Sequence, residues 1–250
     1  TWSCRPPVAT AAELLLPLRP GLVAVPAAGQ SGVCRICHSG CDPRYGQCIP
    51  CREAAQRLGA DEILPISMSI EGELLHRHLR GYKDDRSGQV RARMSLRLAA
   101  LVAVFMQNHS DCAGAFESVV SVPSSTRTAM QAIVQRIPSL RDEYRPALQV
   151  SGTGSKTDLW ADRFTVTREV RGERILVLDD TFTRGATLFS ALAALRDAGA
   201  TTVGPVVLGR HVKPSWPPSR EMLAWLAPRT WDERRCCRCG GERANPGQML

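Results

Sequence analysis

The chain has 250 residues, of which 44% are hydrophobic and 22% charged, and this balance excludes a fibrous or wholly disordered protein. Its net charge of +8 permits contact with a phosphorylated small molecule or with nucleic acid. The basic residues are scattered and aromatic residues make up only 5%, so a dedicated nucleic-acid-binding surface is not favoured. The longest apolar stretch, 98–106, is too short for a membrane-spanning helix, and no membrane span is expected.

Two closely spaced cysteine pairs follow a lead-in, 1–30, that is expected to be irregular or to hold a short helix packed on the cysteine segment. The pairs are Cys34-x-x-Cys37 and Cys48-x-x-Cys51, and each can place two thiolates on one side of a tetrahedral zinc ion. A secreted disulfide framework is the alternative, but the rest of the chain has the large core of an intracellular enzyme. We therefore expect a structural zinc finger over residues 31–54. His38 and Cys41 lie inside it and could replace a ligand.

Residues 60–212 alternate apolar strand patterns with helical ones, as in a parallel α/β domain. Strands are predicted at 63–70, 117–122, 164–170, 175–178 and 202–208. Helices are predicted at 53–58, 87–108, 127–136 and 187–198, with a short helix or turn at 74–79, a loop at 81–85 and a flexible segment at 150–162. The remaining residues, 213–250, form a C-terminal extension that is rich in Pro, Trp and Arg and has one short helix at 221–226.

Several residues suited to binding a ligand lie where the continuously apolar strand 175–178 ends. Asp179 and Asp180 follow it, at the edge where open α/β sheets bind ligands. A turn with Thr183, Gly185 and Thr187 then enters a helix, and such a turn offers backbone N–H groups and hydroxyls to a phosphate. The alternative is a plain strand end before a capped helix. The strand, acid pair and turn together favour a sugar-phosphate site, in which the carboxylates accept hydrogen bonds from two ribose hydroxyls.

The C-terminal extension holds a third cysteine group, Cys236-Cys237-Arg238-Cys239. A single CxxC spacing is a weak signal, so we expect a frayed or redox-sensitive tail. A second metal site that recruits Cys4 is the alternative. Cys112 stands apart from the other cysteines and is expected to be a buried small apolar residue.

With its apolar strand, acid pair and Thr-x-Gly-x-Thr loop, the sequence resembles the type I phosphoribosyltransferases. Because a CxxC…CxxC finger precedes the domain, it resembles the ComF-type family within that class, over residues 34–209. The resemblance implies a Rossmann-like parallel-sheet domain in which Asp179 and Asp180 contact the ribose diol. It further implies that the loop holds the 5-phosphate; its candidate residues are Thr181, Thr183, Arg184, Gly185, Ala186 and Thr187. Arg184 stands where the family commonly has a threonine.

The resemblance also implies three neighbouring segments of the site. A pyrophosphate loop would occupy 122–127, with Ser124, Ser125 and Arg127 near the leaving group. Lys83 would reach a phosphate, and a mobile hood at 152–163 would close Lys156 or Arg163 over the pyrophosphate. A plain turn, a solvated lysine and an ordinary surface loop are the respective alternatives.

The implied reaction transfers phosphoribose from phosphoribosyl pyrophosphate to an unidentified nitrogen nucleophile, with Mg²⁺ held largely by substrate oxygens and water. No side chain need act as nucleophile, so His76, His78 and His109 are expected to be solvated helix residues. Two other functions stay open: a non-catalytic sugar-phosphate sensor, and an accessory protein of DNA uptake (competence) that binds single-stranded DNA or a helicase. A cytoplasmic location is expected, although Thr1 is not an initiator methionine and a targeting segment before it is the alternative.

Overall fold

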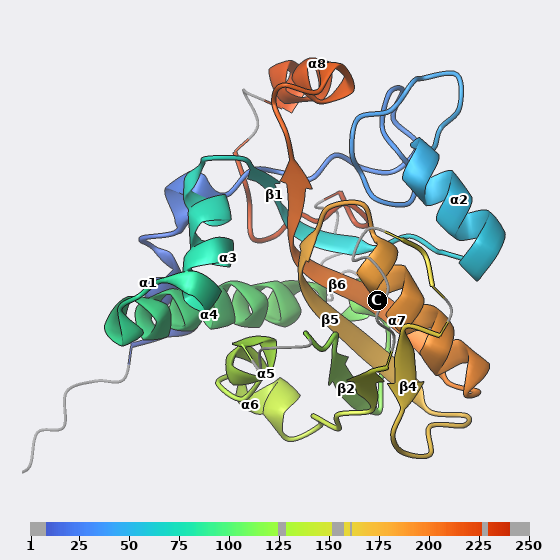
Figure 1. Ribbon diagram of the computed structural model, residues 1–250. Coiled ribbons are helices and arrows are strands. Elements are labelled where there is room, and N and C mark those ends of the chain that lie inside the picture. Colours follow the sequence, from blue (N-terminus) through green and yellow to red (C-terminus); the bar gives the residue numbers. More distant parts are fainter. Residues whose placement is uncertain (1–8, 125–128, 152–157, 161, 227–229, 241–250) are drawn as a thin grey trace, which may run out of the picture.

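The computed structural model describes residues 9–124, 129–151, 158–160, 162–226 and 230–240 (Figure 1). Its centre is a four-stranded parallel sheet with the strand order β1-β6-β5-β2. The four strands are β1 (Leu64–Ile70), β2 (Ser118–Ser121), β5 (Arg174–Phe182) and β6 (Thr201–Val212). A separate antiparallel pair consists of β3 (Leu148–Val150) and β4 (Phe164–Val166). This arrangement confirms the predicted α/β class with a parallel sheet.

Helices cover both faces of the sheet. On one side lie α1 (Ala11–Leu15), α3 (Leu74–Asp84), α4 (Gly88–Ala113), α5 (Ala129–Val134) and α6 (Pro138–Arg141) (Figure 1). On the other side α7 (Ala186–Asp197) packs together with the cysteine segment and α2 (Ile49–Leu58). The short helix α8 (Pro217–Leu226) lies beyond the end of β6 (Figure 1). None of the described helices combines the length and apolar character that crossing a bilayer requires.

The central strand β5 explains the continuous apolar run in the sequence. Leu176 and Leu178 are buried in the core under α3 and α4, whereas Ile175 and Val177 are buried in the core under α7. A strand covered on both faces needs apolar residues at every position rather than at alternate ones. Each of these fully buried side chains stabilises the fold by about 1.5–3 kcal/mol relative to exposure.

Helix α3 corrects the loop predicted at 81–85, because it continues through Asp84. Its buried residues include Leu75, Leu79 and Tyr82, whose spacing places them on one face of a helix packed beside α4. Gly81 permits the close approach, since a Cβ there would lie 2.5 Å from the Met94 sulfur. The added turn carries Tyr82 and Lys83 to the end of β5, which the loop prediction could not foresee.

Other boundaries also differ from the sequence predictions. Strand β5 continues past Leu178 to Phe182, and β6 continues to Val212, because neighbouring parallel strands pair with both extensions. Strand β4 ends at Val166 rather than at residue 170. The lead-in helix α1 packs on α4 and not on the cysteine segment. Farther along the lead-in, Val23 accepts a hydrogen bond of 3.1 Å from the Met68 amide of β1 and also pairs with Thr230 of the tail.

A bulge in β6 brings the end of α4 against the sheet. The register between β5 and β6 shifts at Gly204, whose φ is 38°. A Cβ at Gly204 would lie 2.2 Å from the carbonyl oxygen of Ala113, the last residue of α4. Glycine is therefore required here by both the backbone conformation and the space.

We predict that Gly204→Ala lowers the free energy of unfolding by roughly 3 kcal/mol, because a left-handed alanine is strained and its methyl group overlaps Ala113. Gly172→Ala is the matched control. Its φ of 77° carries the same backbone penalty, but no atom lies within 4 Å of the added Cβ, so a loss of about 1 kcal/mol is expected. Denaturant unfolding measures both, and equal losses would contradict the close contact.

Candidate functional site

The acid pair lies within β5, at its carboxyl end, rather than after the strand as predicted. Consecutive strand residues point to opposite faces, so the two carboxylates meet different surroundings. Asp180 is 9% exposed, accepts a hydrogen bond from the Tyr82 hydroxyl and forms an ion pair with Lys83. Asp179 is half-buried, and its Oδ1 accepts the Asp180 backbone N–H at 2.8 Å.

Among the described residues, Asp180 has a cationic partner and Asp179 has none, and this difference sets their electrostatics. Burial, together with the adjacent Asp180 charge, raises the pKa of Asp179 to about 7, while Lys83 and the backbone hydrogen bond act in the opposite direction. Asp179 can therefore change its protonation state near neutral pH. A raised carboxyl pKa at a strand end is common at ligand and catalytic sites.

Gly185 shapes the turn that follows the acid pair. Its φ is 86°, and a Cβ would come within 2.4 Å of the rings of both Phe182 and Phe189, which pack edge to face at 5.3 Å between centroids. The turn then enters α7, whose first N–H groups have no partners inside the helix and favour an anion. A cavity of about 360 Å³ lies at this turn; it is lined by Asp179, Thr181, Phe182, Thr183, Arg184, Gly185, Ala186, Thr187 and Leu188.

A second cavity, of about 230 Å³, adjoins the first and shares Asp179, Thr181 and Thr187 with it. Its lining also includes two cationic side chains, Lys83 from α3 and Arg163 from the segment before β4. The remaining lining residues are Tyr82, Val122, Pro123, Ser124, Ala129, Met130, Val150 and Asp180. Both carboxylates therefore line the second cavity together with the two cationic side chains, and Asp179 also lines the first cavity at the start of α7.

Most of the residues predicted for the site meet at these two cavities. Those within the described chain are Lys83, Ser124, Asp179, Asp180, Thr181, Thr183, Arg184, Gly185, Ala186 and Thr187. Ser125, Arg127 and Lys156 lie outside the described residues. Tyr82 was missed, although its spacing from Leu75 and Leu79 would have revealed it had the helix been continued.

The four predicted finger cysteines also come together. The ligand atoms of Cys34, Cys37, Cys48 and Cys51 all lie within 4.8 Å of one another, and the sulfurs of Cys37 and Cys48 are 3.8 Å apart. A tetrahedral zinc site with Zn–S bonds of about 2.3 Å requires sulfurs about 3.8 Å apart. The thiol set and its spacing therefore fit zinc, which would be structural because four protein ligands leave no open position.

His38 and Cys41 do not join this cluster. His38 is buried, and its two ring nitrogens lie 2.9 Å and 3.2 Å from the carbonyl oxygens of Pro26 and Ile63. Hydrogen bonds that His38 donates to Cys237 and Glu62 outweigh burial, which acts in the opposite direction, and raise the pKa of His38 to about 11. A protonated imidazole donates from both nitrogens and offers no lone pair to a metal.

Arg210 of β6, a residue that the sequence did not single out, connects the finger to the sheet. It is 6% exposed; its Nε donates to the Cys37 carbonyl at 3.1 Å and its Nη1 donates to the Phe182 carbonyl at 3.2 Å. Its Nη2 lies 3.5 Å from the Cys37 sulfur. Hydrogen bonds from Cys34, Cys48 and Cys51, and then the Arg210 charge, hold the pKa of Cys37 well below its usual range despite burial.

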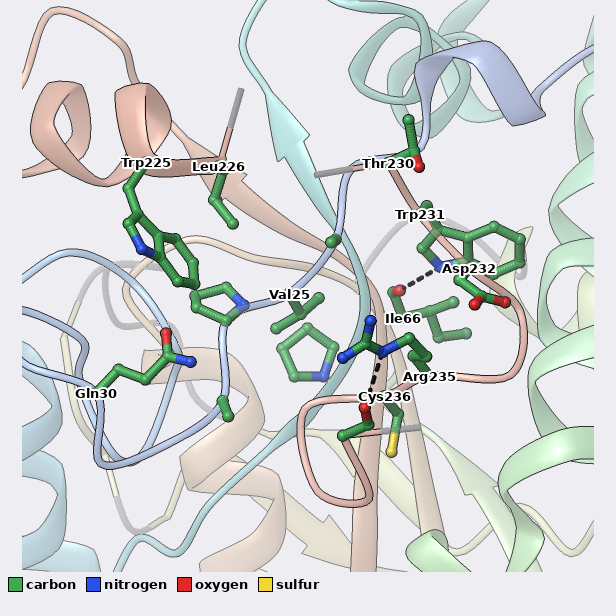
Figure 2. A pocket seen from close by; sticks show the side chains of 15 residues that line it. Val25, Gln30, Ile66, Trp225, Leu226, Thr230, Trp231, Asp232, Arg235 and Cys236 are labelled. Atoms are coloured by element: carbon green, nitrogen blue, oxygen red, sulfur yellow. Dashed lines mark hydrogen bonds between the residues drawn. The ribbon is translucent and has the colours of Figure 1, made fainter. Parts of the chain in front are cut away.

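A third cavity, of about 470 Å³, is larger than the two at the acid pair and lies elsewhere in the molecule (Figure 2). It lies between the lead-in, the start of β1 and the tail, and its labelled lining residues include Val25, Ile66, Trp225, Trp231 and Arg235 (Figure 2). Trp231 donates its indole N–H to the Ile66 carbonyl at 2.9 Å, and Arg235 bonds the Gly240 carbonyl at 2.8 Å. The lining contains neither residue of the acid pair, so this cavity is separate from the candidate site.

Comparison with solved structures finds several phosphoribosyltransferases. The allosteric regulatory enzyme of purine biosynthesis matches at 22% identity and a TM-score of 0.30, over 43% of this chain and 24% of that enzyme. The purine phosphoribosyltransferase of Pyrococcus horikoshii matches at 13% identity and a TM-score of 0.31, over 47% of this chain and 89% of that enzyme. The orotate phosphoribosyltransferase of Aeropyrum pernix matches at 18% identity and a TM-score of 0.32, over 56% of this chain and 71% of that enzyme. No protein-family model and no curated protein matches the sequence.

We predict that Arg210→Met lowers the free energy of unfolding by roughly 3–5 kcal/mol and weakens zinc retention, because buried thiolates lose their only contacting guanidinium among the described residues. Arg174→Met, at a half-exposed surface position, should change stability by less than about 1 kcal/mol. Denaturant unfolding combined with zinc release to a chromogenic chelator measures both effects. Equal behaviour of the two variants would show that Arg210 does not stabilise the finger.

Asp179→Asn should stabilise the protein at alkaline pH. Between about pH 4 and 7 the unfolded carboxyl is ionised while the native one keeps its proton, so this group makes the unfolding free energy fall as the pH rises. The difference between variant and parent should grow by on the order of 2 kcal/mol from pH 5 to pH 8. Asp197→Asn, at an exposed position on α7, should show no such trend. A difference that does not depend on pH would mean that native Asp179 is ionised throughout.

Proposed function

We propose that the chain binds phosphoribosyl pyrophosphate with Mg²⁺ at the end of β5 and transfers the phosphoribosyl group to a nitrogen nucleophile. The observation that carries the proposal is the position of the acid pair where two different cavities meet. The glycine turn and the α7 N-terminus lie on one side, and a cavity with two cationic side chains lies on the other. Phosphoribosyl pyrophosphate has a matching order of groups, because its ribose lies between a phosphate on C5 and the pyrophosphate on C1.

The 5-phosphate would occupy the cavity at 183–187. Its oxygens would accept hydrogen bonds from N–H groups of the first turn of α7 and from the hydroxyls of Thr183 and Thr187. Gly185 keeps the turn clear of a side chain. The exposed Arg184 would add positive charge at the rim, or extend into solvent without affecting the site.

The acid pair would hold the ribose. Asp179 lines both cavities and Asp180 lines the second, so their acceptor oxygens lie beside the cavity proposed for the 5-phosphate. Tyr82 and Lys83 fix the Asp180 carboxylate in one orientation, because both bond its Oδ2. The less constrained Asp179 would then adjust to the sugar hydroxyls.

The pyrophosphate would occupy the second cavity. Lys83 and Arg163 line it, and they would stabilise the charge that develops on the leaving group. Ser124 would donate a hydroxyl to the same group, and Ser125 and Arg127 follow it in the chain. Carboxylate oxygens are suitable neighbours for Mg²⁺, which when bound would neutralise pyrophosphate oxygens.

In the reaction the C1–O bond breaks and pyrophosphate leaves with the bonding electrons. A bond forms between C1 and the nitrogen of the acceptor, which afterwards loses a proton to solvent. These residues bind, orient and stabilise charge, and no protein nucleophile is required. The cysteine finger and the acid loop also support membership of the ComF-type family as part of this proposal.

Titration calorimetry tests binding. Parent protein with its metal retained should bind phosphoribosyl pyrophosphate and Mg²⁺ with micromolar affinity, and Asp179→Asn/Asp180→Asn should weaken binding by at least about 100-fold, since two ribose contacts are lost. Asp197→Asn, on the far end of α7, is the control and should bind like the parent. Far-UV circular dichroism establishes that each variant is folded.

Release of pyrophosphate in the presence of candidate nitrogen acceptors then separates an enzyme from a sensor. Binding without release for any acceptor would favour the non-catalytic sugar-phosphate sensor. Failure of the folded parent to bind would overturn the proposal. Salt-dependent binding of single-stranded DNA or a helicase would then become the leading function.

A further inference from the structure

The tail cysteines do not stand alone, because two of them meet the end of α4. The ligand atoms of His109, Cys112, Cys236 and Cys239 all lie within 4.8 Å of one another. This contradicts two sequence predictions. His109 is not solvated but 1% exposed, and Cys112 belongs to a group of potential ligands.

The separations within this group suit tetrahedral zinc. The sulfurs of Cys236 and Cys239 are 3.4 Å apart, and the Cys239 sulfur lies 3.6 Å from Nδ1 of His109. Zn–S bonds of about 2.3 Å and Zn–N bonds of about 2.0–2.1 Å require about 3.8 Å between sulfurs and about 3.6 Å between sulfur and nitrogen. A disulfide between Cys236 and Cys239 would instead need sulfurs about 2.05 Å apart.

His109 is held in the orientation that a metal ligand needs. Its Nε2 lies 2.9 Å from the Glu233 carbonyl oxygen, so Nε2 carries the proton and Nδ1 directs its lone pair toward the Cys239 sulfur. The backbone at His109 departs from helical geometry, with φ −136° and ψ 23°. This kink lies between the body of α4 and Cys112, and it marks the point at which the helix meets the tail.

The tail repeats the backbone geometry of the first finger knuckle. In Cys34-x-x-Cys37-His38, the His38 amide donates to the Cys34 carbonyl at 2.9 Å and His38 has φ 57°. In 236–240, the Gly240 amide donates to the Cys236 carbonyl at 3.0 Å and Gly240 has φ 59°. The Cys239 amide also lies 3.4 Å from the Cys236 sulfur. Two separate segments thus fold each CxxC pair into the same turn.

An arginine accompanies each cluster. As Arg210 does at the finger, Arg238 anchors the tail knuckle: it donates to the Cys112 carbonyl at 2.7 Å and to Glu62 at 2.9 Å. Cys237, between the two tail ligands, points elsewhere. It is 4% exposed and belongs to a separate group with His38 and Glu62, in which both ring nitrogens of His38 lie within hydrogen-bond distance of backbone carbonyls.

We propose that His109, Cys112, Cys236 and Cys239 form a second structural zinc site, which fastens the C-terminal tail to the end of α4. Four protein ligands close the coordination sphere, so the ion stabilises the fold and does no chemistry. It joins two segments more than a hundred residues apart, and the ligands come from one helix and one knuckle. The first finger, by contrast, is local in sequence.

The metal content of the full-length protein tests this site. Purified under reducing conditions, the parent should contain about two zinc ions per chain, one for each four-ligand cluster. Cys236→Ser/Cys239→Ser should retain about one, and so should Cys34→Ser/Cys37→Ser. Cys237→Ser is the matched control, because it alters the neighbouring buried tail cysteine and should retain both. His109→Cys replaces one zinc ligand by another and should also retain both.

The measured zinc contents either support or overturn the second zinc site. A parent protein with a single zinc, lost on changing Cys34 and Cys37, would overturn the proposal even if the tail variants fail to fold. Loss of zinc in Cys237→Ser but not in Cys236→Ser/Cys239→Ser would assign the second ion to the His38 group instead. Cobalt substitution gives a further readout, since removal of the tail ligands should decrease the thiolate-to-cobalt absorption of the parent.

Discussion

The finger is attached to the sheet through the buried guanidinium of Arg210. It bonds a carbonyl and a sulfur of Cys37, and it also bonds the carbonyl of Phe182, the last residue of β5. A thiolate cluster is costly to bury without compensating positive charge, and Arg210 adds to the charge that a bound zinc would supply where the finger packs on α7 and the sheet. Because Phe182 lies directly before the turn that contains Gly185, the same side chain links the finger to the candidate site. The finger is therefore part of the support of the site rather than a separate appendage.

Strand β5 explains how two adjacent carboxylates differ. Its alternation turns Asp180 toward α3, where Tyr82 and Lys83 neutralise and orient it. Asp179 is left beside that charge, partly buried, with a raised pKa. Such an arrangement costs stability in the absence of a ligand, and a sugar diol or a cation would offset that cost on binding. The acid pair is thus better explained by binding than by packing.

Local patterns predicted much of this molecule, and long-range contacts account for what they missed. The apolar run before Asp179 and the Thr-Gly turn predicted the strand, the acid pair and the helix start, because each depends on neighbours in sequence. The CxxC pairs predicted the finger for the same reason. Tyr82, Arg210 and the partners of Cys236 were missed, since the role of each depends on a residue far along the chain. Cys112 and His109 carry an i, i+3 spacing on one helix, which was the available signal for the second cluster.

The pairing of Val23 with Met68 affects how the sheets of two molecules could associate. Strand β1 is an edge of the sheet, and the lead-in and then Thr230 of the tail lie alongside it. At the opposite edge, the segment 143–145 exchanges backbone hydrogen bonds with Val119 of β2. Open edges are where sheets of two molecules fuse into one, and here short pieces of the same chain already occupy part of each. In the part of the chain that the structure describes, these pieces leave less of either edge available for pairing with a strand of a second molecule.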